Sequence, residues 1–383
     1  MKATVAIVQR RLVHYREPLF ERLREVLAAR GITLRVLHGR PSAAEVKRGD
    51  EGRLPWAEAL PTRHLFDGRV CWMPFADRVR DCALVVLPQE NRLAHNLPWL
   101  LRPPKHMRTA FWGHGADLQT RRAHGAGEWM KRRLLPRVDW WFAYSRLSAE
   151  RVLGAGYPAD RVTTLDNTID VEALQIEVAA ARSEGRAALR AALGLPDGDG
   201  PVGLYLGALA ADKAIPLLLD MAARLRAQAQ SFQLLIGGDG PLAPQVRSAA
   251  GRADAAVVWL GALRGRRKAQ ALAAADLMLY PGAIGLGVLD AFAAGLPLLT
   301  RRGSCRAPES AYLQPGVNAC IAEDDAQAFV AAAIRLLQDE DERRRLAAGA
   351  AASASRHGIG GMAMRFADGI EAALRAPPWV RRW

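Results

Sequence analysis

The stretch LMLYPGAIGLGVLDAFAAGLPLLT, residues 277–300, carries the clearest structural signal in the sequence. An apolar run ends at Tyr280, a loop with three glycines follows, and a helix-forming segment runs from about Leu286 until Gly295 stops it. A glycine loop that opens a helix leaves backbone N–H groups unpaired at the positive end of the helix dipole. Such a loop can hold a phosphate or pyrophosphate, although glycine loops also serve as plain tight turns in α/β domains.

Three more strand-like runs end in glycine-containing loops, GALAADK (207–213), IGGDGPL (236–242) and WLGAL (259–263). In a parallel sheet the carboxyl ends of the strands lie at one edge, where ligands bind. Lys213 adds a cation suited to a diphosphate. The four loops together predict a diphosphate site at one sheet edge.

Short apolar runs alternate with longer amphipathic segments along the chain, which is typical of parallel sheets covered by helices. The pattern occurs twice in 383 residues and predicts two doubly wound, Rossmann-like α/β domains, residues 1–170 and 171–362. We expect the C-terminal helix, about 363–383, to pack back on the first domain. The expected strands are 4–8, 32–38, 83–87, 108–112, 140–144 and 162–165, then 202–207, 233–237, 256–260, 277–280, 296–300 and 319–322.

Composition narrows the class of protein. Hydrophobic residues make up 50% and charged residues 24% of the chain, as in ordinary globular proteins. The longest stretch without charge, 277–289, falls short of the ~20 apolar residues of a membrane span. The opening MKATVAIVQRR is unlike a signal peptide, so we expect a cytoplasmic protein. Four cysteines without CxxC spacing predict reduced thiols and no metal site.

The net charge of +14 is concentrated in residues 1–170, which hold 29 basic and 18 acidic side chains. Such an excess attracts nucleic acid, an anionic membrane surface or a phosphorylated substrate, and it also arises from arginine on ordinary solvated faces. Basic segments with tryptophan at 97–108, 128–141 and the terminal PPWVRRW are compatible with a peripheral contact with an anionic membrane face. Trp140 and Trp141 lie in an expected strand, so we expect these two in the core. Trp379 and Trp383 are the candidates for that contact at the terminus.

The motifs in their order resemble a known family. GALAADK, IGGDGPL, WLGAL, the 277–300 stretch and ESAYLQPGVNA (309–319) are similar to the nucleotide-sugar-binding domain of retaining GT-B glycosyltransferases, the group 1 or GT4-type family. The resemblance is strong over 201–322. It is weaker in the first half, where it rests on VAIVQRRLVHYREPLFERL (5–23), WGHGADL (112–118) and DNTID (166–170).

The resemblance implies a GT-B fold with an interdomain cleft and a metal-independent hexosyltransferase. The donor would be a nucleotide diphosphate-sugar, a substrate and not a cofactor. The acceptor would be a glycan, a lipid-linked molecule or another hydroxyl compound, in cell-envelope polysaccharide or glycoconjugate synthesis on the cytoplasmic side of the inner membrane. Nucleic acid is not an expected partner.

Residue roles follow from the same resemblance. It implies that Lys213 contacts the donor diphosphate, that Asp290 contacts the nucleotide ribose and that His114 faces the donor sugar, with His114 and Lys213 as the catalytic candidates. The chain departs from the family at Ala208, where an arginine is usual, and at Gly282, where the first of two glutamates is usual. The other donor-site candidates are Gly207, Gly238, Gly240, Leu263, Gly285, Leu286 and Gly287.

Further donor or acceptor candidates are Arg10, Arg11, Tyr15, Arg16, Asp117 and Glu309. The basic ones fit a solvated helix start equally well, and the two acids fit helix caps. Two other classes stay compatible with the sequence. One is a sugar-nucleotide epimerase or a phosphorylase of the same fold, and the other is a non-catalytic basic binding protein on that scaffold.

Overall fold

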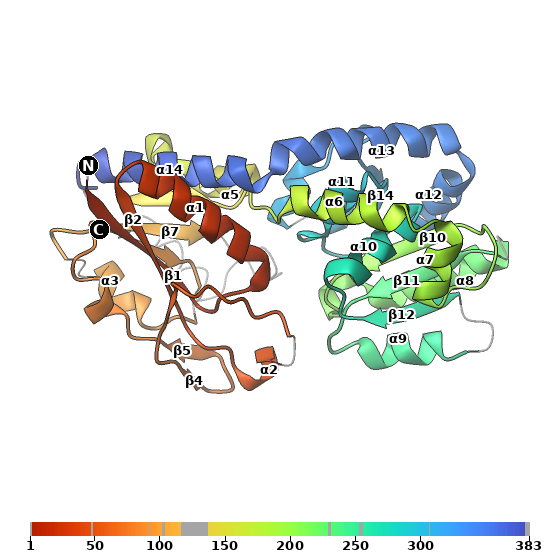
Figure 1. The fold of residues 1–383 in the computed structure, drawn as a ribbon, viewed down its shortest axis with the longest axis horizontal. Coiled ribbons are helices and arrows are strands. Elements are labelled where there is room, and N and C mark those ends of the chain that lie inside the picture. The colour runs from red at the N-terminus through yellow and green to blue at the C-terminus, as the bar shows by residue number, and fades with distance from the viewer. Residues whose placement is uncertain are drawn as a thin grey trace. The chain divides into compact units, whose positions relative to one another are not determined.

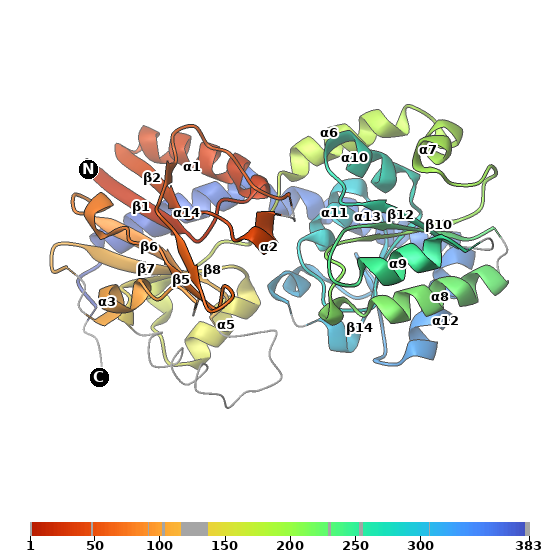
Figure 2. The same cartoon turned by 90° about the horizontal axis from the view of Figure 1, so that it is seen from below.

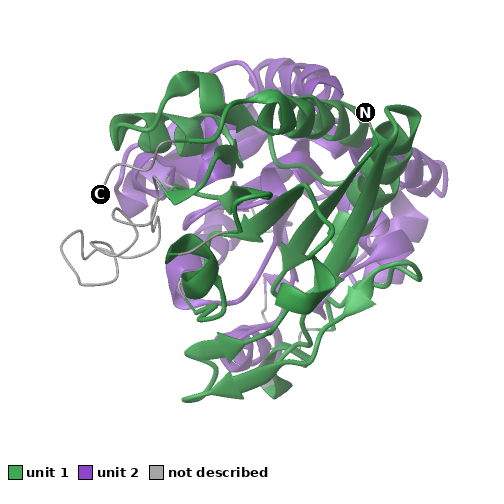
Figure 3. Cartoon of the chain, turned by 90° about the vertical axis from the view of Figure 1, so that its left-hand side faces the viewer, with its two compact units in different colours: residues 1–169, 359–383 green, residues 170–358 purple. Residues whose placement is uncertain are grey.

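The computed structural model describes residues 2–46, 49–90, 92–101, 104–115, 137–228, 231–252, 256–305 and 307–379 (Figure 1). The chain forms two compact units, and it passes between them twice (Figure 3). Unit 1 comprises residues 1–169 and 359–383, and unit 2 comprises residues 170–358. Each unit has its own parallel sheet, which confirms the predicted pair of doubly wound α/β folds.

Unit 1 is built on a seven-stranded parallel sheet in the order β3-β2-β1-β6-β7-β8-β9. Its central strands are apolar throughout because both faces of the sheet are covered. In β1, Val5 and Ile7 face one core while Ala6 and Val8 face the other. The strands are β1 Ala3–Gln9, β2 Ile32–His38, β3 Glu58–Ala59, β6 Leu84–Pro88, β7 Arg108–Gly113, β8 Trp140–Ala143 and β9 Val162–Thr164.

Helices α1 (Glu17–Ala29) and α14 (Ile359–Arg375) lie side by side on one face of this sheet (Figure 1). The helix from the end of the chain therefore completes the core of unit 1, where Phe366 contacts Trp112 of β7. The remaining elements of unit 1 are α2 Ala43–Val46, α3 Asn96–Leu101, α5 Arg146–Gly154, the hairpin of β4 Arg63–Leu65 and β5 Val70–Trp72, and the 3-10 turns His14–Arg16, Ala76–Arg78 and Ala159–Arg161.

Unit 2 has a six-stranded parallel sheet in the order β12-β11-β10-β13-β14-β15. Its strands are β10 Val202–Leu206, β11 Gln233–Gly237, β12 Val257–Gly261, β13 Leu277–Tyr280, β14 Leu298–Arg301 and β15 Cys320–Ala322. Right-handed crossovers place α8 and α9 on one face of this sheet and α10 and α11 on the other (Figure 2). Helix α12, which follows the last strand, contacts α8, and α6, α7 and α13 contact α10 or α11.

The helices of unit 2 are α6 Val171–Arg182, α7 Arg186–Leu193, α8 Ile215–Gln228, α9 Ala243–Ala250, α10 Gly265–Ala274, α11 Gly287–Ala294, α12 Ala326–Gln338 and α13 Glu340–Ala354. The 3-10 turns are Ala211–Lys213, Arg302–Ser304, Pro308–Tyr312 and Ser355–His357. None of the helices in the described parts of either unit is long and apolar enough to span a membrane.

The C-terminal segment differs from the sequence expectation. Helix α14 ends at Arg375, and residues 376–379 pack against unit 1 instead of extending as a helix. The Trp379 N–H donates to Asp139 Oδ1 at 3.0 Å, and the indole lies 5.2 Å from the guanidinium carbon of Arg161. Trp379 is therefore half-buried against unit 1, and its contact with a membrane stays a prediction. Trp383 lies outside the described residues.

Candidate functional site

The candidate site of unit 2 lies at the point where the sheet order reverses. Strand β10 pairs with β11 on one side and with β13 on the other, so the connections after β10 and β13 leave in opposite directions. In open α/β sheets such a switch point forms a crevice at the carboxyl ends of the strands. The loop after β10 carries Lys213, and the loop after β13 carries the glycines at 282, 285 and 287.

Lys213 joins these two loops. Its Nζ donates to the Ala283 carbonyl at 2.8 Å and lies 3.0 Å from Asp212 Oδ2. The Ala283 N–H donates in turn to the Asp212 carbonyl at 2.9 Å. The side chain of Lys213 is 18% exposed, so it remains partly accessible to solvent beside the glycine loop.

Gly282 explains one departure from the family pattern. A Cβ atom at Gly282 would lie 2.2 to 2.5 Å from the backbone atoms of Lys213, which is closer than side-chain carbons approach backbone. A glutamate cannot stand there while the two loops are in contact. The close approach of the two loops therefore requires a glycine at 282.

Other glycines in the predicted set are also required by contacts within the protein. A Cβ atom would lie 1.8 Å from the Gly207 carbonyl oxygen at Gly238, 2.6 Å from a backbone oxygen at Gly240, and 2.0 Å from the Tyr280 hydroxyl at Gly287. Leu263 packs against the end of β11 in the same region. These residues shape the carboxyl edge of the sheet.

Gly285 is different. A Cβ atom there would meet nothing within 4 Å, and its φ lies outside the positive range that only glycine adopts readily. Neither packing nor backbone conformation within the protein requires a glycine at 285. The loop backbone at Gly285, just before α11, is therefore open for close approach by another molecule. In the first turn of α11 the N–H groups of Val288 and Leu289 donate to the Gly285 and Leu286 carbonyls, at 3.3 and 2.9 Å.

Helix α11 carries Asp290 in its first turn, and the side chain is buried. Lys268 of α10 holds its Nζ 2.6 Å from Asp290 Oδ1. Sequence reasoning missed Lys268 because it ends the basic run RGRRK, which resembles a solvated helix face. Only the packing of α10 on α11 brings the lysine to the carboxylate.

Two buried tyrosines form hydrogen bonds to backbone carbonyls at the end of β10 and in the loop after it. Tyr280 donates from its hydroxyl to the Leu206 carbonyl and Tyr205 donates to the Ala208 carbonyl, both at 2.9 Å. Burial raises the pKa of both phenols above the usual value, so they remain neutral donors at physiological pH. The backbone at Ala208, where the family has an arginine, is fixed by this bond.

In unit 1 the sheet order reverses between β1 and β6, and ion pairs occupy the loops there. Arg10 contacts Glu90 at 2.7 Å and Glu45 at 2.6 Å, and Arg11 donates two bonds to Asp50 at 2.6 and 2.7 Å. Both predicted arginines are thus neutralised by carboxylates of the same unit. Glu90 lies two residues after the end of β6, and this strand-end position is the sequence signal that could have indicated it.

Arg16 has different surroundings. It donates from Nη2 to the Tyr144 hydroxyl at 2.8 Å and from Nη1 to Gln9, and its guanidinium carbon lies 4.4 Å from the centre of the Trp112 ring. Within the described residues it forms no ion pair. The exposed ring of His114, just after β7, is 4.4 Å from that of Tyr144. The structure therefore brings Arg16 and His114 to one aromatic cluster at the carboxyl edge.

The three remaining candidates lie in different places. Tyr15 is within 5.7 Å of the Arg16 guanidinium carbon. Glu309 is buried in the 3-10 turn beside α11, and Asp117 lies outside the described residues. The described residues contain no group of three or more His, Cys, Asp or Glu side chains that could hold a metal.

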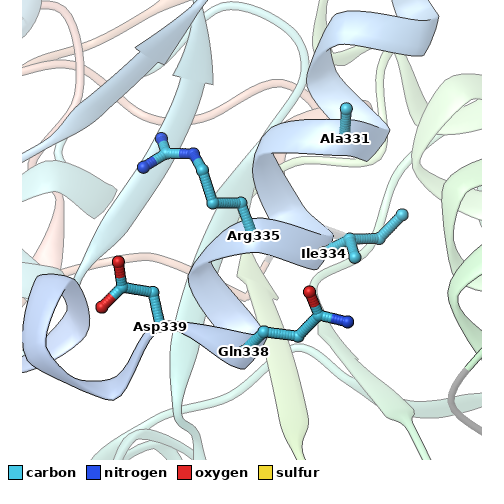
Figure 4. A pocket seen from close by; sticks show the side chains of 5 residues that line it. All are labelled: Ala331, Ile334, Arg335, Gln338 and Asp339. Atoms are coloured by element: carbon cyan, nitrogen blue, oxygen red, sulfur yellow. The ribbon is translucent and has the colours of Figure 1, made fainter.

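Two hollows among the described residues lie away from these candidates. One of about 470 Å³ is lined by four residues of α12, with Asp339 just after it (Figure 4). The other, about 720 Å³, lies at the amino ends of β1 and β2 in unit 1, opposite the edge that carries the candidates. Neither hollow is lined by a predicted site residue.

Comparisons with known proteins agree with this geometry. Residues 200–339 match the family described as "Glycosyl transferases group 1". No curated protein matches the sequence. Among solved structures, Anabaena HepE in complex with UDP-glucose is 14% identical with a TM-score of 0.69, over 97% of this chain and all of that one.

Two further structures share the fold. WaaG, a glycosyltransferase involved in lipopolysaccharide biosynthesis, is 14% identical with a TM-score of 0.65, over 95% of this chain and 98% of that one. UDP-GlcNAc 2-epimerase from Neisseria meningitidis is 14% identical with a TM-score of 0.61, over 96% and 99%. At such identities the likeness concerns the fold alone. The chain thus has the GT-B fold, and its residues 200–339 match the group 1 glycosyltransferase family.

Proposed function

We propose that this protein transfers a hexosyl group, with retention of configuration, from a nucleotide diphosphate-sugar to a glycan or lipid-linked acceptor. The pathway we assign is cell-envelope polysaccharide or glycoconjugate synthesis at the cytoplasmic membrane face. The match of residues 200–339 to the group 1 glycosyltransferase family supports transfer from a nucleotide-sugar. The observation that carries the proposal is the 2.8 Å bond from Lys213 to the glycine loop at the switch point of unit 2.

The proposed donor site uses groups that lie at this switch point. The donor diphosphate lies over the backbone N–H groups of Gly285, Leu286 and Gly287, and Lys213 exchanges its bond to a carbonyl for one to a phosphate oxygen. Asp290 accepts from a ribose hydroxyl through the oxygen that Lys268 does not hold. Preorganised N–H groups and a cation stabilise the charge that develops on the departing diphosphate.

In the transfer step the bond from the anomeric carbon to the diphosphate breaks, and a bond to the acceptor oxygen forms on the same face. The departing phosphate oxygen takes the proton of the acceptor hydroxyl. We assign His114 to the neighbourhood of the reacting sugar and unit 1 to the acceptor. Lys213 supplies the positive charge, so the proposed transfer is metal-independent and should continue in EDTA.

A thermal-shift screen against UDP, GDP, ADP and their sugars tests donor binding, because a ligand that binds only the folded state stabilises it. With the nucleotide so identified, Lys213→Ala should weaken binding by about 1.5–3 kcal/mol, the usual contribution of a charged hydrogen bond. Arg252→Ala, an exposed cation after the end of α9, is the matched control. Equal affinity of the Lys213 variant and the parent in calorimetry would reject the assignment.

A sugar-nucleotide epimerase is the second candidate, because the fold is shared with such an enzyme. The two reactions differ in their need for an acceptor. Product analysis after incubation with the nucleotide-sugar alone separates them: an epimerase changes the sugar under these conditions, whereas the proposed transferase leaves it attached and unchanged. Nucleotide binding without any turnover across acceptors would favour a binding protein instead.

A further inference from the structure

The hairpin of β4 and β5 in unit 1 presents an apolar outer face. Its antiparallel register pairs Arg63 with Trp72 and Leu65 with Val70. Residues directly opposite each other in such a pair point to the same side of the ribbon. Cys71, whose side chain is fully buried, marks the inner side. Arg63, Leu65 and Trp72 therefore share the side that faces away from the core.

The apolar side chains of this hairpin are unusually exposed. Phe66 at the tip is 74% exposed, and Leu65 and Trp72 are 46% and 40% exposed. Phe66 also has a φ of 50°, in the left-handed region that is costly for a bulky residue. The chain thus keeps a large aromatic ring in water and in a strained turn, although folding alone favours neither.

The base of the hairpin is fixed to the body of unit 1. The Cys71 N–H donates to the Arg92 carbonyl at 2.7 Å, and the Cys71 carbonyl accepts from Ala94 at 3.2 Å. On the other strand, His64 Nε2 lies 3.0 Å from the Arg40 carbonyl oxygen. The tip is therefore held outward on an anchored base.

Cations flank the apolar tip. Arg63 and Arg69 are exposed, and neither forms an ion pair with a described residue. Asp67 supplies the hairpin's only carboxylate, so residues 63–72 have a net positive charge. An aromatic tip flanked by arginines matches a surface that is apolar beneath a layer of negative charge.

We propose that residues 63–72 form a docking surface for anionic lipid headgroups, with Phe66 and Leu65 entering the boundary of the acyl chains. The inference adds to the proposed function the surface that contacts the membrane. It rests on the proposed function only in one respect, the proposal that the acceptor is lipid-linked. A stable protein interface buries about 800 Å² per partner. Three side chains on one small hairpin provide less, whereas a bilayer needs only a few inserted groups and cations.

Sedimentation of the full chain with vesicles tests the proposal. We expect binding to phosphatidylcholine vesicles that contain phosphatidylglycerol, and none to phosphatidylcholine alone. Phe66→Ser should lower the partition coefficient at least about tenfold, since it removes the aromatic side chain that the bilayer would bury. Arg63→Glu with Arg69→Glu should abolish binding, and Asp67→Asn should strengthen it several-fold, by about the effect of one charge near the surface.

Matched controls come from unit 2. Ile176→Ser removes a side chain that is 72% exposed on α6, and Arg252→Glu with Arg267→Glu reverses two exposed cations. These variants should bind vesicles as the parent does. Equal partition of the parent and the Phe66 variant, or no binding of the parent at low salt, would overturn the proposal. Self-association that depends on the hairpin, without vesicle binding, would overturn it in favour of a second copy of the chain.

Failure of this inference is distinguishable from failure of the proposed function. Phe66→Ser should bind the nucleotide as the parent does, and Lys213→Ala should bind vesicles as the parent does. Loss of vesicle binding in the Lys213 variant would show that the hairpin alone does not provide the surface. Circular dichroism melts of each variant verify that the fold is retained.

Discussion

Gly282 and Gly285 are three residues apart in one loop, but their surroundings give them different functions. Gly282→Ala forces a Cβ into the backbone of Lys213 and should lower the free energy of unfolding by about 1–3 kcal/mol. Gly285→Ala meets only open space, so it should change stability by less than about 0.5 kcal/mol while weakening nucleotide binding. Urea unfolding and calorimetry measure the two effects. A Gly285 variant with unchanged affinity would show that no ligand approaches the loop there.

Glu45 gives unit 1 a pH dependence. Burial alone would raise its pKa, but the hydrogen bond from the Ser42 N–H and the charge of Arg10 together lower the pKa to about 2, from an ordinary value of 4.5. A carboxylate with a depressed pKa stabilises the fold above its unfolded pKa, and this contribution disappears as the pH falls from about 4.5 toward 2. Glu45→Gln should therefore be less stable than the parent at neutral pH, and the difference should shrink over that range.

Unfolding by urea at a series of pH values measures this difference. Glu25→Gln is the matched control, because Glu25 pairs with Arg22 at 2.9 Å but is exposed to solvent. Exposed pairs contribute little, so the Glu25 variant should follow the parent at every pH. A constant gap between the Glu45 variant and the parent from neutral pH to pH 2 would contradict the assigned pKa.

Among the elements, the long buried strands were predictable and the hairpin was not. Strands β11 and β13 are buried throughout and nearly all apolar, and β2 alternates buried apolar with exposed polar residues, so all three could be predicted residue for residue. The strands β4 and β5 have three residues each and keep apolar side chains on the solvent side. Their pattern therefore lacks the alternation between buried apolar and exposed polar residues on which strand prediction depends.

The same distinction holds for the candidate site. Lys213 and the glycine loop could be predicted because each directly follows a strand, and the order of a parallel sheet brings strand ends together. Lys268, the partner of Asp290, could not be predicted in this way, because it lies on a helix whose packing is not encoded in its local sequence. The ion pairs that neutralise Arg10 and Arg11 were missed for the same reason, since Glu45 and Asp50 are far along the chain from both arginines.

The segment after α14 belongs to the fold of unit 1. Arg161 donates to the Pro377 carbonyl at 2.9 Å and stacks with Trp379. Trp379→Ala should lower the free energy of unfolding by about 1–3 kcal/mol, through lost packing and a lost cation–π contact. It should leave vesicle binding unchanged once the protein is folded. If the Trp379 variant kept full stability but bound vesicles more weakly, Trp379 would instead be assigned to the membrane-binding surface.

At the scale of the whole molecule, the proposed donor site and the proposed lipid surface belong to different units. The donor groups lie in residues 207–290, and the lipid-binding hairpin lies in the basic first 170 residues. Two sites that influence each other do so with equal coupling in both directions, because binding free energies are linked. The hairpin and the donor loops share no helix or strand, so we expect little coupling between nucleotide binding and lipid binding.

We therefore predict that saturating nucleotide leaves the vesicle partition coefficient within about twofold of its value without ligand. Anionic vesicles should likewise leave nucleotide affinity unchanged. Added salt should weaken vesicle binding steeply, since the Debye length falls from about 10 Å at 0.1 M to about 3 Å at 1 M. Sedimentation with and without nucleotide, across a salt series, measures both effects. A tenfold or larger shift of the vesicle partition coefficient on adding nucleotide would contradict this prediction. It would mean that donor binding in unit 2 changes the lipid-binding surface of unit 1.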